Sequence, residues 1–133
     1  MTVNNDTSEL AAPPGHTLWE LPESLQQFDS VREADILQDV ITAYVQDGAQ
    51  RLEQLRQAAV RGRMDEFRAQ AHSFKGSSHQ MGATQIAKLC ENLELRNGRP
   101  SEGELLSAVD QMDASFRSIS QAMFAFLAAA SKT

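Results

Sequence analysis

Apolar residues recur every three or four positions along most of this chain, which is the spacing of a helix with one buried face. The pattern predicts four long helices, over residues 30–61, 64–82, 83–97 and from residue 101 to the C-terminal region. No stretch alternates polar and apolar residues as a half-buried strand does. We therefore expect an all-α fold, an antiparallel four-helix bundle joined by short polar turns.

Residues at the expected helix ends agree with these bounds. Ser30 and Glu33 have the spacing of a capping box, and Ser101 and Glu104 repeat it before the last helix. Gly62 follows the first long helix, where a glycine commonly ends one. In chain order, the predicted core positions are Leu37, Ile41, Tyr44, Gly48, Leu52, Leu55 and Ala59, then Phe67, Ala71, Phe74, Ser78 and Met81, then Ile86, Leu89, Cys90 and Leu93, and finally the seven-residue repeat of Leu105, Val109, Met112, Phe116, Ile119, Met123, Phe126 and Ala130.

The N-terminal region has a different pattern. Residues 1–18 are polar, with two prolines and a glycine at 13–15, and we expect them to form a flexible tail. Pro22, followed by Leu25 and Phe28, predicts a short helix that caps one end of the bundle. The predicted organisation is therefore a tail over residues 1–18 and a bundle over residues 19–133.

Composition narrows the classes of function. The chain has 133 residues, which suits one domain, and 12 Lys and Arg against 18 Asp and Glu give a net charge of -6. This balance, without a basic patch, disfavours nucleic acid as a partner. A single cysteine, Cys90, excludes an internal disulfide and suits a reducing compartment. Without a secretory signal pattern or an apolar stretch of about 20 residues, we expect a soluble, cytoplasmic protein that does not bind membranes. Because the helices have no second obvious apolar stripe, we expect a monomer.

One face of the second helix is chemically unlike the core. At about 100° per residue, His72 points away from the apolar face, and Arg68, Lys75, Gly76 and His79 share its ridge. A neutral imidazole is a nucleophile near pH 7, and phosphoryl transfer requires positioning and nearby cations. Lys75 is the expected ligand of phosphoryl oxygens, with Arg68 a weaker candidate. Gly76 costs about 1 kcal/mol relative to Ala inside a helix, which we interpret as clearance for a large partner.

Residues 72–78, His-Ser-Phe-Lys-Gly-Ser-Ser, resemble the H-x-x-K-G-[ST]-[SA] signature of histidine-containing phosphotransfer (HPt) domains. The similarity continues through residues 81–83 and 86–94 and covers about residues 33–127. It implies that His72 accepts a phosphoryl group from a receiver-domain aspartate, through a ring nitrogen that we expect to be Nε2. It also implies that Lys75 binds the phosphoryl oxygens and that Gly76 leaves room for the receiver. By the same resemblance Ser77 is a polar group near the site and Glu94 faces the histidine.

Other chemistries are weaker interpretations of the same residues. His72 and His79 are seven positions apart, about 10 Å along a helix, which is too far for two ligands of one metal ion. Glu91 and Glu94 have no cleft that would make them a hydrolytic pair. The sequence contains no phosphate-binding loop of the G-x-x-x-x-G-K-[ST] type, so we expect no kinase or ATP site and no cofactor. Any Mg²⁺ is expected to come from the acidic pocket of the partner receiver.

The favoured hypothesis is a histidine phosphotransfer protein of a two-component multistep phosphorelay, with receiver domains of response regulators or hybrid kinases as partners. On this hypothesis Arg68, Gly76, Ser77 and His79 contact the receiver. An alternative is a module that binds and regulates a receiver without carrying phosphate. The dimerisation segment of a histidine kinase is a third class, and the number of helices disfavours it.

Overall fold

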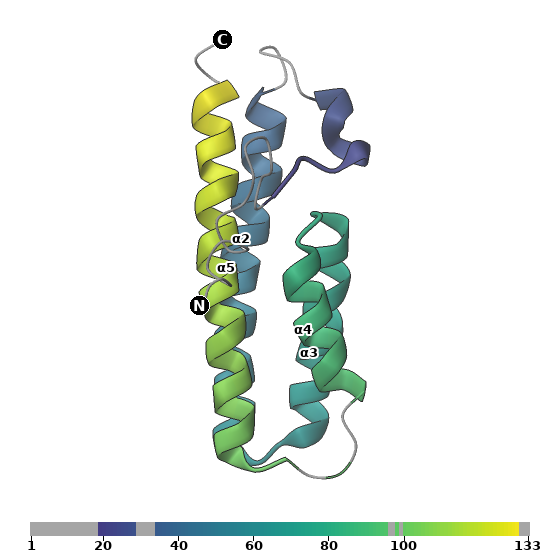
Figure 1. The fold of residues 1–133 in the computed structure, drawn as a ribbon, viewed down its shortest axis with the longest axis vertical. Helices are drawn as coiled ribbons and strands as arrows, with labels where there is room; N and C mark the ends of the chain where they lie inside the picture. The colour runs from purple at the N-terminus through teal and green to yellow at the C-terminus, as the bar shows by residue number, and fades with distance from the viewer. Residues whose placement is uncertain (1–18, 29–33, 96–97, 99, 131–133) are drawn as a thin grey trace, which may run out of the picture.

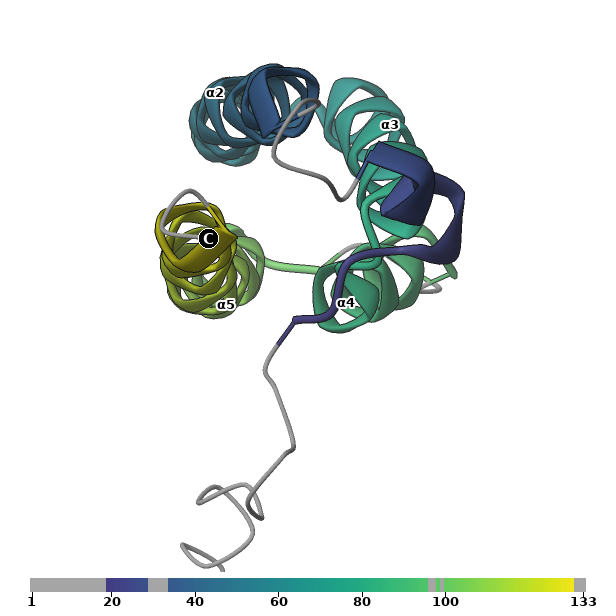
Figure 2. The same ribbon diagram turned by 90° about the horizontal axis from the view of Figure 1, so that it is seen from above.

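The computed structural model describes residues 19–28, 34–95, 98 and 100–130, and all of its regular structure is helical. A 3-10 helix, η1 (Glu23–Phe28), precedes four α-helices: α2 (Ala34–Arg61), α3 (Met64–Gln80), α4 (Thr84–Leu95) and α5 (Glu102–Ala130). Each α-helix runs opposite to the one before it (Figure 1). Seen from above, α2 lies between α3 and α5, and α4 completes the square (Figure 2). The predicted all-α antiparallel bundle is confirmed.

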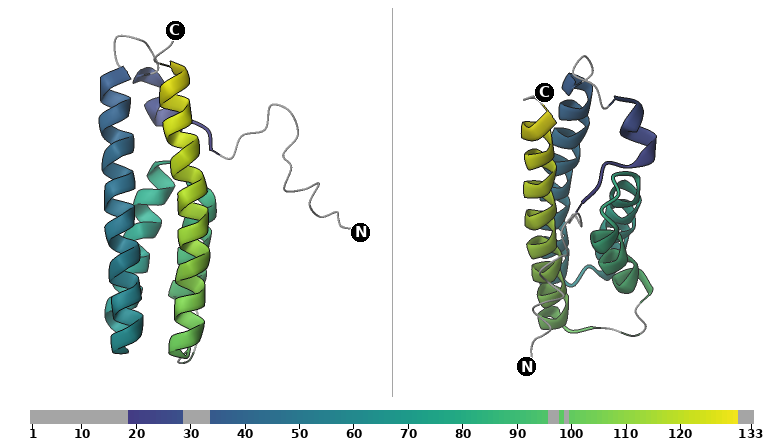
Figure 3. Two further views of the ribbon diagram at one scale, coloured as in Figure 1. Left: turned by 90° about the vertical axis from the view of Figure 1, so that its left-hand side faces the viewer. Right: turned by 45° about the horizontal axis from the view of Figure 1, so that its top comes forward.

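The four helices differ in length, and this difference sets the shape of the molecule. With 28 and 29 residues, α2 and α5 are each about 42–44 Å long, whereas α3 has 17 residues and α4 has 12. The shorter pair forms a hairpin that covers only part of the longer pair (Figures 1 and 3). Near the closed end of this hairpin η1 packs against α2. The predicted short capping helix is therefore confirmed, as a 3-10 helix that begins one residue after Pro22.

The segment before η1 packs against the turn between α3 and α4 and is hydrogen-bonded to it. Trp19 is buried, and its indole Nε1 donates a hydrogen bond of 2.6 Å to the carbonyl of Met81. Gly82 in this turn has φ +74°, and a Cβ there would lie 3.2 Å from the ring of Pro22. Glycine therefore suits both the backbone and the close approach of the N-terminal segment.

The described helix ends confirm the predicted signals. Glu104 N–H donates to Ser101 Oγ at 3.1 Å, and Ser101 N–H donates to Glu104 Oε1 at 2.8 Å, which is the predicted capping box of α5. Gly62 has φ +68° directly after α2. The capping box expected at Ser30 and Glu33, like the predicted tail 1–18, lies outside the described residues.

The core follows the predicted spacing closely. Its centre holds three aromatic rings, Tyr44, Phe74 and Phe116, with centroids 5.9–6.3 Å apart. Gly48 faces Phe116 so closely that an added Cβ would overlap the ring, which explains a glycine among the core positions of α2. Leu89 and Phe126, predicted to be inward, are only partly buried because they lie at the edges of their helix faces.

Candidate functional site

His72 lies on the outer side of α3 with 68% of its side chain exposed. Its place follows from the helix period, because Ala71 and Phe74 on the opposite side are fully buried. One turn further, Gly76 is exposed, and a Cβ added there would meet no atom within 4 Å. The predicted exposure of both residues is confirmed, and no neighbouring group obstructs the surface beside His72 at Gly76.

Glu94 joins the two helices of the hairpin at this point. It lies on α4, next to the buried Leu93, so its carboxylate emerges at the seam between α3 and α4. Its Oε2 lies 2.5 Å from Nδ1 of His72, and its Oε1 lies 2.7 Å from Nζ of Lys75. The carboxylate side chain is 21% exposed. The structure therefore contains a triad of imidazole, carboxylate and ammonium, in which the imidazole is the most exposed group.

The charged groups of this triad stabilise one another. The contact with the Lys75 ammonium, and after it the hydrogen bond from His72, hold the pKa of Glu94 below its ordinary value against the effect of burial. The same carboxylate raises the pKa of Lys75, with a smaller contribution from Glu91. Glu94 is consequently an anion and Lys75 a cation near neutral pH.

The contact with Glu94 distinguishes the two nitrogens of the imidazole. An ionised carboxylate only accepts hydrogen bonds, so Nδ1 of His72 is the donor and holds the proton. In the neutral ring the other nitrogen, Nε2, then has a lone pair, and it has no partner among the described residues. A histidine in this state presents a nucleophile to solvent at a fixed ring orientation.

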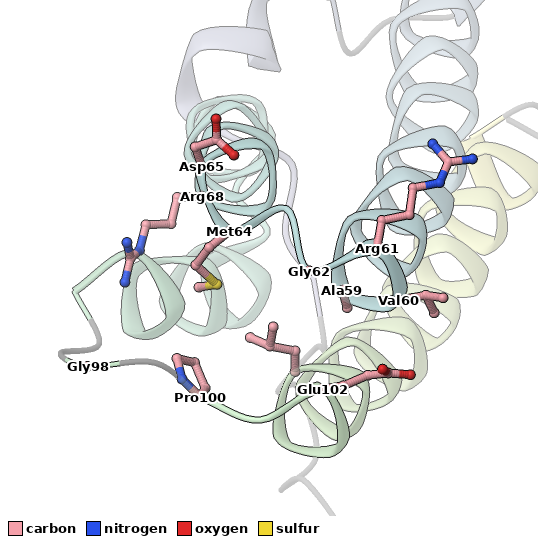
Figure 4. Close-up of a pocket in the computed structure, with 11 residues that line it drawn as sticks. Ala59, Val60, Arg61, Gly62, Met64, Asp65, Arg68, Gly98, Pro100 and Glu102 are labelled. Atoms are coloured by element: carbon pink, nitrogen blue, oxygen red, sulfur yellow. The ribbon is translucent and has the colours of Figure 1, made fainter.

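The predicted ridge is only partly an exposed ridge. His72, Gly76 and His79 are exposed, but Lys75 is 24% exposed because its ammonium turns toward Glu94, and Arg68 is half-buried. Arg68 extends toward the end of α4 and lines a cavity of about 750 Å³ at the open end of the hairpin (Figure 4). That cavity is lined by residues of the α2–α3 turn and the start of α5 and does not include His72.

Ser77 and the residues behind the site have structural contacts. Ser77 Oγ donates to the carbonyl of Phe74 at 3.2 Å, so its hydroxyl is used within α3. Beneath it, Ser78 is fully buried and shares a 2.7 Å hydrogen bond with the hydroxyl of Tyr44. Burial raises the pKa of the Cys90 thiol to about 12. The hydroxyls of Ser77 and Ser78 are thus hydrogen-bonded within the bundle, and the Cys90 thiol is buried.

The family resemblance indicated Glu94 as a residue facing the histidine, but nothing in the sequence indicated that Lys75 and His72 share one carboxylate. The signal for that arrangement is the hairpin register, because α3 and α4 are antiparallel around the turn at residues 81–83. Within the described residues, no group of three or more His, Cys, Asp or Glu side chains is arranged to hold a metal ion. Nor does any described helix combine the length and apolarity that crossing a membrane requires.

Comparison with known proteins identifies one family. The family model described as Hpt domain matches residues 39–120 of this chain, which is more than half of its length. The matched span begins in α2, ends in α5 and contains the whole α3–α4 hairpin. No curated protein and no solved structure matches the chain. The family match agrees with the resemblance carried by residues 72–78.

Proposed function

This chain belongs to the Hpt domain family, and from that membership we propose that it is a histidine phosphotransfer protein of a two-component multistep phosphorelay. His72 accepts the phosphoryl group from an aspartyl phosphate of one receiver domain and passes it to an aspartate of another. The observation that supports this proposal best is the contact between Nδ1 of the exposed His72 and Glu94, since it leaves Nε2 for the incoming group.

The transfer step is an in-line displacement at phosphorus. Nε2 of neutral His72 attacks, the N–P bond forms, and the P–O bond to the donor aspartate breaks, so that the aspartate leaves as a carboxylate. The proton on Nδ1 remains in the hydrogen bond to Glu94, and the phosphorylated ring becomes an imidazolium. The Glu94 carboxylate stabilises this new positive charge, as a preorganised anion beside a site where charge develops. The onward transfer is the same step in reverse, with a second aspartate as the attacking group.

Lys75 has two parts in this proposal. Its ammonium has three donors, and one of them is used by Glu94, so the others are available to the oxygens of the transferred group. The ion pair also holds Glu94 in place beneath His72. Lys75 is therefore a cation near the phosphoryl group and an anchor of the positioning carboxylate.

Approach of a whole receiver domain requires an open surface. The absence of a side chain at Gly76, one turn from His72, supplies space at the point where the partner's aspartyl phosphate must reach the ring. Gly76, Ser77, His79 and Arg68 are proposed as partner contacts, with Arg68 the most peripheral because it lies at the open end of the hairpin. The proposal includes no kinase or nucleotide site in this chain, and any Mg²⁺ belongs to the receiver.

The test is phosphoryl transfer from a labelled receiver domain to the chain, with His72→Gln beside the wild type. His79→Gln makes the same chemical change at a proposed partner contact on the same exposed side of α3, so it separates loss of the phosphoacceptor from loss of an exposed imidazole. We expect a label on the wild type and on His79→Gln that is lost in acid and kept in base, and no label on His72→Gln. A receiver that binds all three chains and labels none would contradict phosphate transfer and favour the alternative, a receiver-binding module that does not carry phosphate.

A further inference from the structure

Beyond Gly76, toward the α3–α4 turn, the seam between the two helices opens into a small groove of about 240 Å³. We call it the upper groove; its lining residues are His79, Thr84, Gln85, Ala87, Lys88 and Glu91. It lies on the same side of the hairpin as His72, because His79 is two helical turns from His72 on α3 and Glu91 is one turn from Glu94 on α4. About 10 Å along α3 separate the two histidines. A protein docked on His72 therefore covers the upper groove as well.

The charges of the upper groove differ from those of the His72 site. At the site, Lys75 and Glu94 neutralise one another. In the groove, by contrast, Lys88 is exposed and forms no ion pair with any described side chain, and neither does His79. Glu91 is the acidic member of the lining, and it is close enough to Lys75 to contribute to the raised pKa of that ammonium. The end of the groove near the α3–α4 turn thus presents an unpaired cation and a ring N–H donor.

We propose that the upper groove receives an acidic side chain of the receiver domain, with Lys88 as a specificity-determining cation and His79 as a second donor; this rests on the proposed function. A partner that brings an aspartyl phosphate presents an anionic surface to the hairpin. The chain as a whole has a net charge of -6 and repels such a surface over most of its area. A cation at Lys88, on α4 six residues before Glu94, favours the one orientation in which the phosphate meets His72, because charged groups fix the register of an interface.

The experiment measures binding of isolated receiver domains to the chain in the His72→Gln background, so that binding is observed without phosphoryl transfer. The test variant is Lys88→Gln. The matched control is Arg61→Gln, which also changes the net charge from -6 to -7 but is the last residue of α2, near the opposite end of the hairpin. Each titration is made at about 0.1 M and about 1 M salt, where the Debye length is about 10 Å and about 3 Å.

We expect Lys88→Gln to weaken binding about two- to fivefold at the lower salt concentration, the size of one exposed ion pair, and by less at the higher one. Arg61→Gln is expected to bind like the parent chain. Glu91→Gln removes the acidic side chain from the same groove and is expected to tighten binding. Opposite signs at Lys88 and Glu91 cannot come from a loss of folding, which would weaken both variants.

A further variant identifies the partner group. Lys88→Glu is expected to bind poorly to the wild-type receiver and to regain affinity when an acidic residue beside the receiver's phosphorylation site is changed to Lys.

The proposal is overturned if Lys88→Gln and Arg61→Gln bind alike, if Glu91→Gln weakens binding, or if no receiver binds at all. If wild-type His72 is labelled but Lys88 has no effect on affinity, the groove contact is contradicted and the proposed function is supported. If binding depends on Lys88 but His72 is never labelled, the groove contact is supported and the proposed function is contradicted.

Discussion

Replacement of Glu94 tests whether the carboxylate beneath His72 sets the reactive form of the ring. Glu94→Ala removes the acceptor of the Nδ1 proton and the partner of Lys75, while Glu94→Gln keeps an uncharged acceptor of nearly the same size. Without the acceptor, the neutral ring can place its proton on Nε2, and a protonated Nε2 cannot attack phosphorus. The rate of phosphoryl transfer should therefore fall in the order wild type, Gln, Ala.

The size of the effect follows from the exposure of the two partners. A hydrogen bond to a charged group contributes about 1.5–3 kcal/mol when it is shielded from water. His72 is 68% exposed and Glu94 is 21% exposed, so we reduce this to about 1 kcal/mol, as for exposed ion pairs. One kcal/mol is about a fivefold change in the ratio of the two ring forms. We expect transfer to be slower by up to about fivefold in Glu94→Ala and by up to about twofold in Glu94→Gln, because a neutral bond has about half the strength.

Two measurements are needed on the same samples. Single-turnover transfer from a phosphorylated receiver gives the rate, and the nitrogen chemical shifts of the His72 ring show which nitrogen holds the proton. Glu53→Ala on the outer face of α2 is the control, because it removes an exposed carboxylate far from the hairpin seam. A wild-type transfer rate in Glu94→Ala, with the ring proton moved to Nε2, would refute the argument that this tautomer governs the reaction.

Three further substitutions test the fold around the site. Gly76→Ala should raise the free energy of unfolding by about 0.5–1 kcal/mol, since no atom obstructs the new methyl group, and should slow transfer by filling the clearance; a faster transfer would contradict that role. Gly48→Ala should lower stability by about 1–3 kcal/mol in urea unfolding because its Cβ overlaps Phe116, and Phe116→Leu in the same chain should restore part of the loss. Trp19→Phe leaves the Met81 carbonyl without its donor and should cost about 1–2 kcal/mol in the same assay with transfer unchanged; an unaltered midpoint would show that the contact adds no stability.

Sequence periodicity was sufficient for the fold because each helix buries one continuous stripe. The seven-residue repeat of α5 predicted buried positions from Leu105 to Met123, and the spacing around Phe67 and Phe74 predicted which side of α3 faces solvent. The capping box at Ser101 and Glu104 was predictable because it is a contact between residues three positions apart. Such local rules depend only on neighbouring residues.

Contacts between residues far apart in the sequence were harder to predict. Gly48 fitted the apolar series of α2. The reason for a glycine there is the ring of Phe116, and that contact depends on how closely α2 and α5 approach. The hydrogen bond from Trp19 to Met81 joins residues 62 positions apart, and no local pattern indicates it. Lys75 was expected to point toward the phosphoryl group, whereas its ammonium lies on Glu94, because the register of α3 against α4 brings the carboxylate within 2.7 Å.

The buried thiol behind the site has a practical consequence. Cys90 is the only cysteine of the chain, it is fully buried in α4, and its pKa is raised to about 12. Because alkylating reagents react with an exposed thiolate, Cys90 is modified only when the helices separate. The rate of alkylation therefore measures how often the packing beneath His72 opens. It allows variants such as Glu94→Ala and Gly76→Ala to be compared for local stability without any partner protein.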